Sequence, residues 1–167
     1  MNAELGELVA MQDGYVELAL KAGFVPVAHI TLTFGKERQM VTPERAAFTW
    51  RQLVRRLNEH VGGRSYRRKW GHSYFGYVFG VERHKDGVPH GHAVVDNWID
   101  FDLAHKWWNR VAGWMWIRRV DDDPLAAVRY VLKYVVKDDL RPSYWFQPEK
   151  RRVEPLTGQV FRATPRP

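Results

Sequence analysis

The 167-residue chain contains no cysteine. Disulfide bridges and thiolate metal sites are therefore excluded, so any metal ion would be bound by imidazole, carboxylate and water. The lack of cysteine also favours a cytoplasmic protein. No run of eighteen apolar residues and no charged-then-apolar leader occurs, so we expect neither membrane spanning nor secretion. No phosphate-cradling Gly-X-X-X-X-Gly-Lys-Ser/Thr loop occurs, so we expect no nucleotide-driven motor of that type.

What the chain does have is apolar and basic material. Apolar residues make up 45% of it and include eight tryptophans, enough for the core of one domain. The formal net charge is +7, but residues 1–22 hold four acidic residues and one basic residue, so the remainder carries +10. This basic body favours a nucleic-acid partner.

A pair of histidines separated by one residue, His90 and His92, is the most informative motif. The sequence predicts a strand over residues 73–83, a turn over 85–89 and a returning strand over 90–96. Because alternate residues of a strand point to the same side, both imidazoles are expected on one face of this hairpin.

Two further ligand types fall on the same hairpin. If His84 pairs with His90 across the turn, Glu82 lies opposite His92, and the four side chains share one face. Such a face suits a divalent cation. The alternative is that these are surface histidines on a half-exposed sheet.

A second candidate element is a helix that begins at Pro124, after three aspartates. Within it, Tyr130, Lys133, Tyr134 and Lys137 fall within an arc of roughly 100°, and apolar residues occupy the other side. A tyrosine hydroxyl is a poor nucleophile unless cations or a metal stabilise the phenolate, and lysines one turn away supply that charge. Alternatively, the tyrosines are rim residues and the lysines a solvated face.

A basic segment interleaved with aromatic residues suits phosphates and unpaired bases. Gly62 and Gly63 are expected to end the preceding helix, leaving residues 64–70 as a loop or ragged strand. Some of the arginines before these glycines can instead be the solvated face of that helix. The candidate DNA-binding residues are Arg51, Arg55, Arg64, Tyr66, Arg67, Arg68, Lys69 and Trp70.

The order of elements predicts an α+β fold with a ferredoxin-like (split βαβ) central antiparallel sheet and the tyrosine helix packed across it. Besides the hairpin and that helix, we expect a strand at 25–34, a helix capped by Thr42, a helix opened by Asp100 and a strand at 114–120. The predicted division is an N-terminal extension (1–24), the domain (25–140) and a basic, Pro/Arg-rich C-terminal arm (141–167).

Three motifs in order resemble the HUH endonucleases, specifically the replication initiators of rolling-circle plasmids, phages and small single-stranded DNA viruses. The strand Thr31-Leu32-Thr33-Phe34 is similar to the first motif, Glu82 with His90-Gly91-His92 to the second, and residues 130–137 to the third. The chain departs from the family pattern at Gly91, where a bulky hydrophobe is usual, and in having two tyrosines where many relatives keep one.

The resemblance implies a metal-dependent endonuclease and strand transferase that nicks single-stranded or hairpin origin DNA through a 5′-phosphotyrosine intermediate. By the same resemblance, Tyr130 and Tyr134 are candidate nucleophiles, and Lys133 and Lys137 contact phosphate or metal-bound water. The implied metal ligands are Glu82, His90 and His92, with His84 as a further candidate.

The sensible cofactors are Mg²⁺ or Mn²⁺, although this ligand set does not exclude zinc. A host helicase and polymerase are the expected partners, since the chain itself has no motor motif. Four alternatives stay open: a conjugative relaxase, a transposase with the same chemistry, a metal-dependent hydrolase without a covalent step, and a non-catalytic single-stranded nucleic-acid-binding module.

Overall fold

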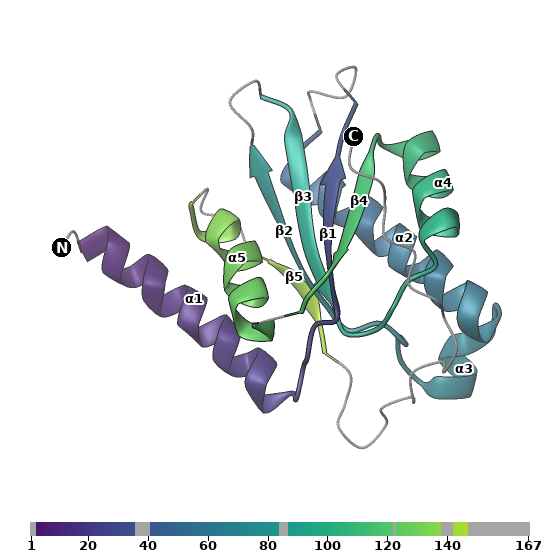
Figure 1. Cartoon of the computed structure of the whole chain (residues 1–167), viewed down its shortest axis with the longest axis horizontal. Helices are drawn as coiled ribbons and strands as arrows, with labels where there is room; N and C mark the ends of the chain where they lie inside the picture. Colours follow the sequence, from purple (N-terminus) through teal and green to yellow (C-terminus); the bar gives the residue numbers. More distant parts are fainter. Residues whose placement is uncertain (1–2, 36–40, 84–86, 122, 138–141, 147–167) are drawn as a thin grey trace.

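A five-stranded antiparallel sheet lies between two layers of helices in the computed structural model, which describes residues 3–35, 41–83, 87–121, 123–137 and 142–146 (Figure 1). The helices are α1 (Ala3–Lys21), α2 (Pro43–Gly62), α3 (Tyr66–Trp70), α4 (Phe101–Val111) and α5 (Pro124–Lys137). The strands are β1 (Ala28–Thr33), β2 (Tyr77–Arg83), β3 (Pro89–Val95), β4 (Met115–Arg119) and β5 (Ser143–Trp145).

The strand order across the sheet is β4-β1-β3-β2-β5, and every neighbouring pair is antiparallel. Helices α2 and α4 follow β1 and β3 in the chain and cover one face, whereas α1 and α5 cover the other (Figure 1). The succession β1-α2-β2-β3-α4-β4 is the split βαβ arrangement. The predicted α+β, ferredoxin-like fold is therefore confirmed.

Side-chain caps fix the starts of the three longer predicted helices. The Thr42 hydroxyl accepts a hydrogen bond from the Arg45 amide at 3.2 Å, and Asp100 accepts one from the Leu103 amide at 2.9 Å. Asp123 accepts from the two amides that follow Pro124, at 2.9 and 3.0 Å. These bonds satisfy backbone donors that a helix start leaves unpaired. At the other end of α2, Gly63 has φ 75°, which confirms the predicted stop.

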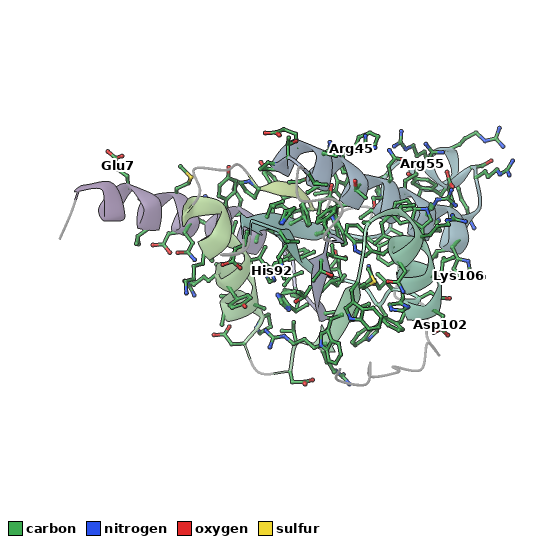
Figure 2. The ribbon with its side chains drawn as sticks, turned by 90° about the horizontal axis from the view of Figure 1, so that it is seen from above. Glu7, Arg45, Arg55, His92, Asp102 and Lys106 are labelled. Atoms are coloured by element: carbon green, nitrogen blue, oxygen red, sulfur yellow. The ribbon has the colours of Figure 1, made fainter. Side chains whose placement is uncertain are left out.

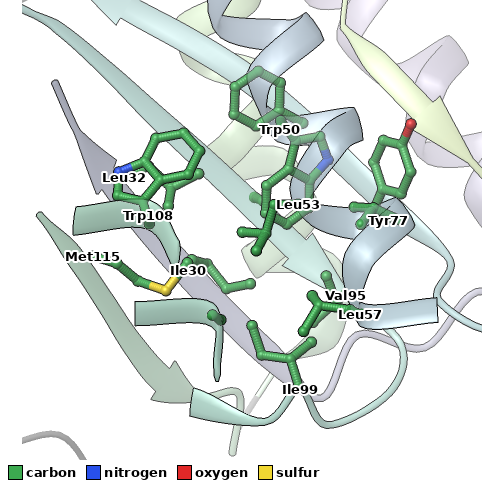
Figure 3. Close-up of a cluster of buried hydrophobic side chains, with 14 of the residues drawn as sticks. Ile30, Leu32, Trp50, Leu53, Leu57, Tyr77, Val95, Ile99, Trp108 and Met115 are labelled. Carbon is green, nitrogen blue, oxygen red and sulfur yellow. The ribbon is translucent and has the colours of Figure 1, made fainter. Parts of the chain in front are cut away.

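Strand alternation divides the core into two clusters. On the α2 and α4 face, Trp50, Leu53 and Leu57 of α2 pack against odd-numbered residues of β2, in the cluster drawn in Figure 3. On the opposite face, Val78 and Val94 pack against α5 and α1. Each strand therefore presents an alternate set of residues to each helical layer, which fixes the face on which every polar side chain lies.

Gly91 has a packing reason. It faces the larger core cluster, where a Cβ would lie 2.7 Å from Phe79 Cε2 and 3.3 Å from Leu32 Cβ. The Phe79 ring stacks on Trp50 with centroids 5.4 Å apart. The volume that a hydrophobe at position 91 would occupy is already filled from β2 and α2, so only glycine fits this strand position without displacing its neighbours.

Some element predictions were wrong or incomplete. Residues 66–70 form the short helix α3 instead of a loop or ragged strand, closed by Gly71 at φ 75°. Strand β2 begins at Tyr77 and not at residue 73, because Ser73 instead forms hydrogen bonds with Asn58 and Phe75. No element was predicted for the segments that form α1 and β5. None of the described helices combines the length and apolarity needed to cross a bilayer.

Candidate functional site

The β2–β3 hairpin carries the predicted ligands with a register that differs by two residues from the prediction. Glu82 pairs with His90, and His92 pairs with Gly80, whereas the sequence reading placed Glu82 opposite His92. The difference arises because Pro89 begins β3 instead of ending the turn, a strand position that proline tolerates. A shift of two keeps every side chain on its face. The expected pairing of His84 with His90 is wrong as well, since Glu82 takes that place, and His84 lies outside the described residues.

Glu82 and His92 lie in direct contact on the face that α5 covers. His92 Nε2 is 3.5 Å from Glu82 Oε2, and the His92 side chain is buried. Burial is the main cause that lowers the pKa of His92 to about 4, and the positive charges of His90 and Arg118 add to it. His92 is therefore neutral near pH 7, which is the form of imidazole that binds metals.

A third histidine, His29, lies beside His92 and was not predicted as a site residue. Strand β1 places its ring 5.8 Å from that of His92, in a stacked orientation. Burial lowers the pKa of His29 to about 3, followed by the charges of Arg118 and His92. Arg118 of β4 donates from Nε to His29 Nδ1 at 3.2 Å, so the proton of the neutral ring is assigned to Nε2. That buried Nε2 has no hydrogen-bond partner among the described residues.

Strand alternation contained a signal for His29 and Arg118. In β1, His29 lies two residues before Thr31 of the first motif and therefore on the same face. In β4, Arg118 pairs with His29 across the sheet. The pairing of β1 with β4 is a long-range feature that the local pattern does not give, and this is why neither residue was singled out.

Helix α5 brings Tyr130 to the three polar side chains. The Tyr130 ring centroid lies 5.3 Å from that of His29 and 5.8 Å from that of His92, and the Arg118 guanidinium carbon lies 5.9 Å from it. The Tyr130 side chain is 38% exposed. Tyr130 can therefore be reached from solvent while it contacts the histidines.

The remaining residues of the tyrosine motif are only partly described. Lys133 is exposed one turn after Tyr130. The backbone at Tyr134 and Lys137 is helical, but their side chains lie outside the described part of the structure. The inner side of α5 is formed by Val128, Val131 and Leu132, all fully buried, as the helical periodicity predicted.

The donor set fits a divalent cation in chemistry and in face. His90, His92 and Glu82 all project from the same side of two paired strands, and burial holds His92 neutral. Two imidazoles with a carboxylate form a ligand set typical of such ions. Within the described ranges, however, no three such side chains already converge on one point. The contact between Glu82 and His92 is the part of the set that is assembled.

Part of this sheet face is not covered by helices. Helix α5 packs over β2 and β3, while β4 forms the edge of the sheet and presents Trp114, Trp116 and Arg118 on the same side as His29. The Trp114 side chain is 48% exposed. An open aromatic and cationic edge therefore adjoins Tyr130.

The predicted DNA-binding residues lie elsewhere. Arg51 and Arg55 belong to α2, and residues 66–70 form α3, both on the face opposite to α5. Figure 2 shows His92 near α5 and labels Arg55 at α2, on the other side of the sheet. The structure thus brings Tyr130 together with the ligand hairpin, but it separates the basic segment from them.

Comparison with known proteins gives one result. A family model described as replication-associated protein ORF2 matches residues 27–139, which include β1, the ligand hairpin and the tyrosine helix. No curated protein and no solved structure matches the chain.

Proposed function

Since this chain belongs to the replication-associated protein ORF2 family, we propose that it is an HUH-type, metal-dependent endonuclease and strand transferase that initiates rolling-circle replication. Its substrate is single-stranded or hairpin origin DNA. The observation that carries the proposal is the placement of Tyr130 against His29, His92 and Arg118, on the face that holds the Glu82 and His90 pair.

The proposed reaction is a transesterification. The Tyr130 hydroxyl oxygen attacks the scissile phosphorus, a new phosphorus–oxygen bond forms, and the bond to the 3′ oxygen breaks. The phenolic proton is balanced by protonation of the departing 3′-hydroxyl. The product is a 5′-phosphotyrosine link with a free 3′ end, and the reverse reaction rejoins strands, so no external oxidant or nucleotide is needed.

Residues of the chain supply positive charge and hydrogen-bond donors around this step. Arg118 places a guanidinium beside the Tyr130 ring and holds His29 in one tautomer. The buried His29 Nε2–H is then a donor available to a phosphate oxygen. Lys133 is exposed on the next turn of the helix and adds a cation at the entrance.

Glu82, His90 and His92 are the residues proposed to bind Mg²⁺ or Mn²⁺. When bound, such an ion polarises a non-bridging phosphate oxygen for in-line attack. The neutral state of His92 and its contact with Glu82 support this assignment. Glu82 also orients the His92 ring through that contact.

Tyr130 and Tyr134 allow two cutting schemes. Residues four apart on a helix lie one above the other, so the two hydroxyls can act alternately on one site. In the simpler scheme, only Tyr130 reacts. The described contacts of Tyr130 with the polar cluster make it the first nucleophile in our proposal.

The test is formation of a covalent protein–DNA adduct. Purified protein is mixed with a randomised single-stranded DNA pool and Mn²⁺, and the products are separated on a denaturing gel. Wild type is expected to give a shifted band, Tyr130→Phe is expected to lose it, and the double variant with Tyr134→Phe controls for either tyrosine. A cleaved strand with a free 5′ phosphate and no adduct would instead indicate a hydrolase. Tight binding without cleavage would indicate a binding module.

A further inference from the structure

A groove on the opposite face of the sheet from Tyr130 has the properties of a second ligand site. Its cavity, of about 400 Å³, lies between α2, α3 and β5. A neighbouring cavity of about 620 Å³ at the start of α2 shares Arg51 and Tyr144 with it, so the two form one continuous groove along α2 and the sheet edge. Cavities of this size are typical of sites that hold small organic groups.

The larger part of the charge in this groove is positive. Arg51, Arg55 and Arg67 line the 400 Å³ cavity, and no carboxylate does so among the described residues. Arg55 is partly neutralised because its Nε lies 2.9 Å from Glu59. Arg51 forms no ion pair with any residue that the structure describes. The groove therefore has cationic capacity available to an anion.

Aromatic side chains accompany these cations. Trp145 of β5 pairs with Tyr77 of β2, and its side chain is 38% exposed at the cavity wall. Tyr66 of α3 is buried, and its hydroxyl accepts a hydrogen bond from Arg67 Nε at 3.2 Å. Trp145 is thus the aromatic surface that a ligand can reach, while Tyr66 fixes the position of an arginine.

The wall formed by α2 and residues 71–74 is held by buried hydrogen bonds. Asn58, 1% exposed, donates from Nδ2 to the Val54 carbonyl at 2.7 Å and to Ser73 Oγ at 2.9 Å, and its Oδ1 accepts from the Tyr74 amide. These bonds tie the helix to the segment before β2. The cavity wall is therefore preformed, which reduces the entropy lost when a ligand binds.

We propose that this groove binds a segment of single-stranded DNA, with phosphates on Arg51 and Arg67 and an unpaired base stacked on Trp145. The groove is distinct from the Tyr130 site, because even- and odd-numbered residues of β2 point to opposite faces. The inference takes the identity of its ligand, DNA, from the proposed function. Arginine with an exposed aromatic ring is the combination that binds unpaired nucleotides without sequence preference.

Charge argues against an occupant from the chain itself. Residues 147–167, which follow the edge strand in sequence, carry more basic than acidic residues, so a cationic groove is a poor partner for them. A duplex does not present unpaired bases to Trp145. With one site on each face of the sheet, a strand cut at Tyr130 can remain held at the groove.

The test measures binding without cleavage. Fluorescence anisotropy with labelled oligothymidylate in EDTA is compared with an abasic oligonucleotide of equal length, which keeps the phosphates and lacks the bases. The pair Arg51→Ala and Arg67→Ala should weaken binding of both probes by on the order of tenfold and reduce the salt slope by about 0.7 for each lost phosphate contact. Trp145→Ala should weaken oligothymidylate binding about tenfold and leave abasic binding unchanged.

Matched variants separate the groove from general charge and from loss of fold. Lys106→Ala with Arg110→Ala removes the same charge from exposed positions of α4 and should change affinity less than about twofold. Trp145→Phe should retain oligothymidylate binding, and Arg51→Gln alone tests an exposed side chain in an unaltered fold.

The groove proposal and the endonuclease proposal fail in different ways. Groove variants should still form the covalent adduct at saturating DNA, whereas a wild type that binds but gives no adduct refutes only the endonuclease. An α4 pair that weakens binding as much as the groove pair would overturn the groove proposal. So would duplex DNA that competes as well as oligothymidylate.

Discussion

At the scale of single residues, Tyr130 is defined by its neighbours more than by its own helix. Arg118 contacts both Tyr130 and His29, and it comes from an edge strand far from either in sequence. A guanidinium in this place supplies charge next to the phosphate that the proposed reaction transfers to Tyr130. The tyrosine motif therefore depends on a residue outside it.

Replacing Arg118 tests this dependence. Arg118→Ala should slow adduct formation by on the order of 10- to 100-fold, because a cation beside the developing charge is lost. Arg119→Ala is the matched control: it removes the same charge from the next position of β4, where Arg119 pairs with the exposed Asp121. The rate is measured as adduct per unit time at saturating DNA. Equal loss in both variants would contradict a specific role for Arg118.

Gly91 gives a second prediction for a single residue. Gly91→Val should lower the free energy of unfolding by about 1–3 kcal/mol, because its Cβ meets Phe79 and Leu32 in a filled core. Denaturant unfolding measures the change. In a Phe79→Leu background, the same substitution should cost less, since the shorter side chain leaves room. An equal cost in both backgrounds would show that the Phe79 contact is not the cause.

At the scale of elements, helix α1 supports the tyrosine helix. Val16 and Ala19 of α1 are buried in the cluster that contains Val128 and Val131 of α5. Gln12 donates to the Arg129 carbonyl at 2.7 Å. The segment that the sequence assigned only as an extension thus packs directly beneath the proposed nucleophile.

Two valines of α1 provide a matched pair. Val16→Ala should lower the free energy of unfolding by about 1–3 kcal/mol, because it leaves a cavity against α5. Val9→Ala, at a position 49% exposed, should change it by less than about 0.5 kcal/mol. Thermal or denaturant unfolding of both variants makes the comparison. Similar values would mean that α1 does not stabilise the domain through this face.

Local patterns predicted most of these elements, and long-range pairing accounts for what they missed. Caps at Thr42 and Asp100 and the apolar spacing of α2 predicted the helices correctly, because such signals lie within a few residues. The hairpin faces were also correct, since alternation is local, but the register depended on Pro89. The contact of His29 with Arg118 and the three-residue β5 rest on strand pairing across the sheet, which a single sequence does not encode locally.

At the scale of the whole molecule, the sheet separates two positively charged regions. The proposed cutting face carries Arg118 and Lys133, whereas the groove on the other face carries Arg51 and Arg67. The acidic residues of the first 22 positions belong to neither region. A net charge of +7 is thus distributed in a way that lets one strand of DNA contact both faces.

Metal binding is also measured on the whole molecule. If Glu82, His90 and His92 bind Mn²⁺ in the folded state alone, Mn²⁺ at about 100 times its Kd should stabilise the protein by roughly 2.7 kcal/mol. Glu82→Gln and His92→Ala should abolish the rise in melting temperature. His60→Ala, on α2 and half-exposed, should retain it. The same rise in wild type and in both ligand variants would place the metal elsewhere.

The central claim is that Tyr130 becomes covalently joined to DNA, and peptide mapping of the adduct tests it most directly. The trapped complex is digested with nuclease and protease, and mass spectrometry locates the peptide that carries the residual nucleotide. We predict that Tyr130 carries it in wild type and that Tyr134 carries any adduct formed by the Tyr130→Phe variant. A nucleotide on a residue outside α5, or cleavage without any modified peptide, would contradict the account.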